Sequence, residues 1–135
     1  HGTPDDDLIY LLENVELGYA RLRSDKEIIK LLNGQKSKLI CCGHTHTPRT
    51  VSLSTRQVII NPGSVGLQAY TDDEPIVHSM ENFNAMASYS LVEETGDSLI
   101  VEHINVVYDV KSAVAECKKR DRMDWVHFLT TGRRM

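Results

Sequence analysis

The stretch Leu39-Ile40-Cys41-Cys42-Gly43-His44-Thr45-His46-Thr47-Pro48 joins an apolar run to two histidines that are one residue apart. The apolar run predicts a buried strand, and the loop that follows turns at Gly43 and cannot continue as a helix past Pro48. In an extended segment His44 and His46 would project to the same side, because side chains alternate along such a chain. The pair therefore suits adjacent metal ions, although the same spacing also occurs on solvated strands.

A second loop, Asn61-Pro62-Gly63-Ser64-Val65-Gly66, follows the β-rich run Val58–Ile60. Pro-Gly is the favoured central pair of a type II turn, and such turns display backbone N–H groups that can face an anion. A simple turn is the alternative interpretation of this segment. Beside the histidine loop, we favour a supporting role in which Asn61 and the turn hold the ligand loop in place. The chain also opens on His1-Gly2, which adds a third histidine.

Gly-His-Thr-His followed about fifteen residues later by Asn-Pro-Gly-Ser resembles the calcineurin-like metallophosphoesterase superfamily. The chain is similar, more narrowly, to the small bacterial and archaeal phosphodiesterases of that group. The similarity extends to Ala87-Ser88-Tyr89 at the start of a late strand and to Val107-Tyr108-Asp109 before a helix, so it covers nearly the whole chain. It implies an α/β fold that forms part of a four-layer αββα sandwich with mixed β-sheets.

The resemblance also implies a site. His46 would bind a first divalent metal ion, and His44 and His1 would bind a second. The metals would be Mn, Fe, Zn or Ni, because imidazole ligands do not choose among them. A metal-bridging hydroxide would hydrolyse small phosphate esters or nucleotides. The expected supporting residues of the two loops are Gly43, Thr45, Asn61, Gly63 and Ser64.

The sequence also departs from the family. Members carry Asp-x-His, Gly-Asp-x-x-Asp and Gly-Asn-His, and none of these occurs here. Three histidines alone leave each metal under-coordinated. We therefore expect residues 1–135 to be the C-terminal portion of a single domain, without a catalytic residue of its own and inactive by itself. The alternative is a non-catalytic protein-interaction scaffold with the same fold, which could form homo-oligomers through an exposed sheet edge. A protein Ser/Thr phosphatase is a third, less favoured interpretation.

Composition is that of an ordinary globular domain, with 135 residues, 41% hydrophobic, 25% charged and a net charge of −4. No apolar stretch approaches the roughly 18 residues that cross a bilayer. Residues 111–135 carry seven basic and three acidic residues, but no interleaved aromatic residues, so nucleic-acid binding is not expected. Three cysteines without Cys-x-x-Cys spacing favour a reduced, cytoplasmic protein, with Cys41 and Cys42 on opposite faces of a strand.

The remaining pattern predicts short elements around these loops. Ser24 and Glu27 form a capping box for a helix that stops at Gly34. His78, His103 and His127 are expected to be surface or hydrogen-bonded structural residues. The other expected elements are a hairpin of Arg49–Leu53 and Gln57–Asn61, a polar surface loop over Leu67–Asn84, a hairpin of Ser88–Glu93 and Ser98–Tyr108, a helix capped by Asp109, and a last helix with Trp125 and Phe128 before Gly132.

Overall fold

The main hydrophobic core lies between one short helix and a three-stranded sheet, in a computed structural model that describes residues 1–135. The helix is α1 (Asp25–Leu31), and Ser24 and Glu27 form the predicted capping box at its start. The strands are β3 (Leu39–Cys41), β4 (Arg49–Ser52) and β5 (Val58–Asn61). The core consists of Leu11, Leu12, Ile28, Leu32, Cys42, Leu53 and Ile59.

The three-stranded sheet is mixed, and its order is β3-β5-β4. Strand β3 runs parallel to β5, whereas β4 and β5 form the predicted antiparallel hairpin. A two-stranded pair, β1 (Glu13–Asn14) and β2 (Arg21–Leu22), precedes α1 and is antiparallel. The fold is therefore mixed α/β, as the sequence predicts.

The segment Leu67–Asn84 is not the single polar surface loop that its composition predicts. It contains the antiparallel hairpin of β6 (Ala69–Asp72) and β7 (His78–Glu81). The face of this hairpin that packs against Tyr10 and Val15 carries the buried residues His78 and Met80, and Ala69 is buried on the opposite face. Strands of four residues offer only two inward positions each, so the polar outward residues and the acidic turn dominate the local composition.

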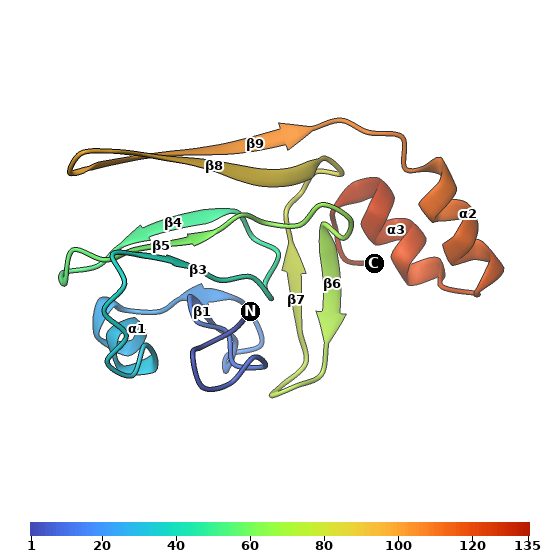
Figure 1. The fold of residues 1–135 in the computed structure, drawn as a ribbon. Coiled ribbons are helices and arrows are strands. Elements are labelled where there is room, and N and C mark those ends of the chain that lie inside the picture. The colour runs from blue at the N-terminus through green and yellow to red at the C-terminus, as the bar shows by residue number, and fades with distance from the viewer.

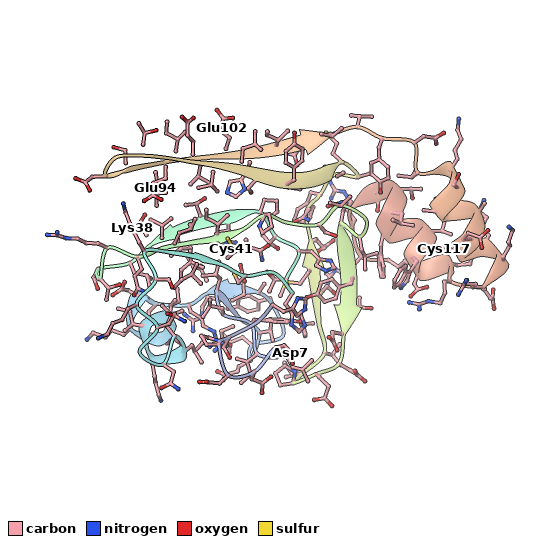
Figure 2. All side chains as sticks on the ribbon, viewed as in Figure 1. Asp7, Lys38, Cys41, Glu94, Glu102 and Cys117 are labelled. Atoms are coloured by element: carbon pink, nitrogen blue, oxygen red, sulfur yellow. The ribbon has the colours of Figure 1, made fainter.

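A long hairpin lies against the other face of the three-stranded sheet, away from α1 (Figure 1). It is formed by β8 (Ala87–Thr95) and β9 (Ser98–Val106), and its last strand ends two residues before the predicted Tyr108. His103 Nε2 lies 2.8 Å from Thr50 Oγ1 on β4. Lys38 and Glu94 face one another between the hairpin and the sheet, with 3.4 Å between Nζ and Oε1 (Figure 2).

Two helices complete the chain beyond the β6–β7 hairpin, at the end of the molecule opposite α1 (Figure 1). Helix α2 spans Lys111–Lys119 and begins after Val110, although the Asp109 carboxylate still accepts a hydrogen bond from the Lys111 N–H at 2.9 Å. Helix α3 spans Met123–Thr131 and ends at Gly132, which has a left-handed φ of 64°. None of the helices is long and apolar enough to cross a membrane.

Candidate metal centre

His44 and His46 occupy a tight loop beyond the end of β3, and both have left-handed backbone conformations, with φ of 64° and 56°. The prediction of an extended loop is therefore wrong, because extended residues have negative φ. This conformation costs an L-residue roughly 1–2 kcal/mol. Strain of this kind gathers at functional loops, where the surrounding structure imposes it. Both side chains nevertheless line the same cleft, together with His1.

Backbone carbonyls fix the orientation of both imidazoles. His44 Nδ1 lies 2.8 Å from the Asp7 carbonyl oxygen, and His46 Nδ1 lies 2.9 Å from that of Leu67. A carbonyl only accepts hydrogen bonds, so each Nδ1 donates to it, and in the neutral form of either ring Nε2 keeps its lone pair. A backbone bond to one ring nitrogen that leaves the other free is typical of metal-binding histidines.

Burial lowers the pKa of His46, and the neighbouring His44 lowers it further, whereas the bond to the Leu67 carbonyl opposes both effects. The imidazole of His46 is therefore held in its neutral form near pH 7, which is the form that ligates a metal ion.

His1 lies against the histidine loop. Its ring centroid is 4.7 Å from that of His44, and its carbonyl accepts a hydrogen bond from the Gly43 N–H at 2.7 Å. The three predicted ligands thus come together at one cleft of about 380 Å³. No group of three or more His, Cys, Asp or Glu side chains in the structure is arranged to hold an ion by itself. A metal ion bound by these imidazoles would therefore need further ligands.

Asn61 connects the two predicted loops. Its fully buried side chain donates from Nδ2 to the Gly43 carbonyl at 3.0 Å and to Thr45 Oγ1 at 2.9 Å. Its Oδ1 accepts from the Gly63 N–H at 2.9 Å. Ser64 acts on the next turn, where its Oγ accepts from the Leu67 N–H at 3.0 Å. Leu67 is the residue whose carbonyl orients His46, so the supporting loop reaches both ends of the histidine loop.

Glu13 is a buried residue of this site that sequence motifs did not identify. Thr45 Oγ1 donates to its Oε2 at 3.1 Å, and Arg49 Nε donates to its Oε1 at 3.0 Å. Burial raises the pKa of Glu13, and its contacts with Arg49 and Thr45 offset the rise only in part. The one available signal is an acidic residue within the apolar run Tyr10–Val15, where burial of a charge demands partners.

Tyr10, Tyr70 and His78 form a second group that sequence reasoning missed. His78 Nδ1 is 2.7 Å from the Ile76 carbonyl, so its Nε2 accepts the Tyr10 hydroxyl at 2.8 Å. The Tyr70 hydroxyl lies 3.0 Å from that of Tyr10 and 3.2 Å from the His44 carbonyl. Burial raises the pKa of both phenols, so both stay neutral. His78 is thus a buried structural residue on a strand.

His103 and His127 are hydrogen-bonded residues away from the cleft, as predicted. His103 Nδ1 lies 2.8 Å from Ser90 Oγ, and His127 Nε2 lies 3.0 Å from the Arg134 carbonyl. Cys41 is exposed and Cys42 is buried, so the two do lie on opposite faces of the sheet. Burial raises the pKa of Cys42 to about 12, which keeps its thiol protonated.

No protein-family model matches this chain, and no curated protein matches it either. A functional assignment therefore depends on the residues of the cleft and on their geometry.

Proposed function

We propose that this chain supplies part of the dinuclear metal centre of a calcineurin-like phosphoesterase, in which His1, His44 and His46 are metal ligands. The observation that carries the proposal is the matched pair of imidazoles, each held at Nδ1 by a backbone carbonyl and each left with a free Nε2. The remaining ligands would come from outside these 135 residues, and the whole would form a four-layer αββα sandwich with mixed sheets.

Two divalent metal ions, when bound, would acidify water and neutralise charge on a phosphoester. The contribution of this chain is to hold and orient ligands. The carbonyls of Asp7 and Leu67 fix the two rings, and Asn61 fixes the backbone between them. The neutral Tyr70 hydroxyl lies beside the His44 carbonyl without adding charge. The activity would be hydrolysis of small phosphodiesters or nucleotides.

The test is His46→Ala in the product of the complete reading frame, loaded with Mn²⁺. We expect hydrolysis of bis(p-nitrophenyl) phosphate to fall by about 100-fold or more, because a ligand with a fixed Nε2 is lost. Calorimetric titration should show weaker Mn²⁺ binding, and circular dichroism should show an intact fold. His103→Ala is the matched control, because His103 lies on the hairpin away from the cleft. Wild-type turnover in His46→Ala would refute the proposal.

A non-catalytic scaffold is the second candidate, and one observation favours it. The outer face of the β8–β9 hairpin exposes Tyr89, Leu91, Ile100 and Val106, each by 41% or more. Glu102 points outward from the same face (Figure 2). Exposed apolar faces of this kind often mark protein contacts. A complete protein that binds no Mn²⁺ and forms a stable oligomer through this face would favour the scaffold over the enzyme.

A further inference from the structure

Helix α3 forms a wall of the histidine cleft. The cleft is lined by His1, His44 and His46 together with Arg122, Asp124, Trp125 and Phe128. Its volume of about 380 Å³ lies within the roughly 300–1,000 Å³ of small-ligand sites. A ligand bound to the histidines would therefore have side chains of α3 within the same cleft.

The buried side of helix α3 packs against the rest of the protein and so fixes the side chains that line the cleft. Phe128 and Leu129 are 3% exposed, and the Gly132 carbonyl accepts a hydrogen bond from the Phe83 N–H at 2.9 Å. Trp125 is different, because 37% of it remains exposed while it lines the cleft. A large aromatic side chain that is left partly open in a cleft offers apolar area that a flat ligand can cover.

Arg122 holds Trp125 in place. Its guanidinium carbon is 4.9 Å from the centroid of the indole ring. Its Nε and one terminal nitrogen donate to the two carboxylate oxygens of Asp124 at 2.8 and 2.6 Å. This pair raises the pKa of Arg122 and lowers that of Asp124, so both remain charged. The other guanidinium N–H groups remain available to acceptors of a ligand.

We infer that the α3 wall recognises the organic group of the substrate, and that this group is a flat aromatic ring such as a nucleobase. The inference rests on the proposed function, because the histidines must hold the phosphoryl end. With the phosphoryl group there, the organic group extends toward Trp125, and its ring stacks on the exposed part of the indole. Stacking of a base on an aromatic side chain is sequence-tolerant, and its loss weakens binding by roughly 10- to 100-fold.

The experiment compares adenosine 5′-monophosphate with ribose 5′-phosphate, which share the phosphate and the sugar but not the base. Their dissociation constants are measured calorimetrically on the Mn²⁺-loaded product of the complete reading frame. Trp125→Ala should weaken adenosine monophosphate binding by roughly 10- to 100-fold and leave ribose phosphate binding within about twofold. Trp125→Phe should restore much of the lost affinity, because it keeps an aromatic face.

Met123→Ala is the matched control, since Met123 lies on the same helix, is 50% exposed and does not line the cleft. If Trp125 has only a structural role, Trp125→Ala will weaken the binding of both ligands equally, and that result overturns the inference. A wild-type protein that binds the two ligands equally, or that binds neither, also overturns it. Failure of the proposed function is separate: it appears as unchanged Mn²⁺ binding and turnover in His46→Ala, whatever Trp125 does.

Discussion

The carboxylate of Glu13 ties the N-terminal segment to the histidine loop. It accepts hydrogen bonds from Thr45 on that loop and from Arg49 on β4. Its side chain is 2% exposed, whereas that of Arg49 is 35% exposed. Burial therefore opposes ionisation of Glu13 more strongly than its partners favour it, and the pKa is raised.

This raised pKa gives Glu13 a definite effect on stability. In the pH range just above its ordinary value of 4.5, the folded protein retains a proton that the unfolded chain has lost. Its contribution to stability is therefore fully present below about pH 4.5 and is lost as pH rises through the folded-state pKa. Glu13→Gln should remove this decline. Urea unfolding between about pH 4.5 and 8 measures it, and a variant with the same decline as the wild type would contradict it.

Glu16→Gln is the control for this experiment, because Glu16 is an exposed carboxylate three residues further along. Its variant should follow the wild-type curve.

Some residues of the candidate site belong to a sequence motif that allows their prediction, and others do not. His44, His46 and Asn61 could be selected because they belong to compact motifs that come after apolar runs. Glu13, Tyr10 and Tyr70 could not be selected, because they reach the site through contacts with residues 26 to 60 positions away. Such contacts depend on tertiary packing, which local pattern does not contain.

At the scale of elements, the turn after β5 constrains the conformation of the histidine loop. Gly63 has a φ of 83° and lies against Pro48 and Ser88. A Cβ at this position would approach Pro48 Cγ to 2.7 Å and Ser88 Oγ to 2.8 Å. Gly66, three residues later, has open space around it and no positive φ. Glycine is therefore required at position 63 of this loop, whereas position 66 has room for a side chain.

Gly63→Ala should lower the free energy of unfolding by roughly 2–4 kcal/mol, from left-handed strain and the contact with Pro48 together. Gly66→Ala should stay within about 0.5 kcal/mol of the wild type or be slightly stabilising. Urea denaturation of both variants gives the comparison. Equal effects at the two positions would show that the turn does not constrain the loop as described.

Helices and strands could be predicted where residues at their own ends mark the start or the stop of the element. The capping box of α1, the β4–β5 hairpin and the final helix before Gly132 could all be placed from local residues. The β6–β7 hairpin could not, because its inward side chains include His78 and its turn is acidic. Burial of His78 depends on the hydroxyl of Tyr10, which lies 68 residues away in sequence.

At the scale of the whole molecule, the sheet β3-β5-β4 separates two unlike environments. Helix α1 and the core cover one face, and the β8–β9 hairpin lies over the other (Figure 1). The hairpin itself turns an apolar face outward, with Leu91 53% exposed. The mixed α/β class follows from the alternation of elements, whereas the four-layer arrangement remains a prediction.

Residues 1–135 alone should not hydrolyse bis(p-nitrophenyl) phosphate with added Mn²⁺, because the three histidines of the cleft would leave two metal ions under-coordinated. The product of the complete reading frame should hydrolyse it under the same conditions. A urea transition of the isolated residues is recorded first, so that inactivity is measured on folded material. Turnover by the isolated residues at a rate comparable with the complete product would exclude the proposed division of the metal centre.

The neighbouring thiols of Cys41 and Cys42 can report how often this part of the sheet opens, because they differ in exposure. Cys41 is open to solvent at the end of β3, whereas Cys42 is packed in the core and has a pKa of about 12. An alkylating reagent under native conditions will modify Cys41 first. It can reach Cys42 only when this strand separates from the core. The ratio of the two labelling rates, measured residue by residue in a mass spectrometer, therefore gives the fraction of molecules in which the strand that carries the histidine loop is open.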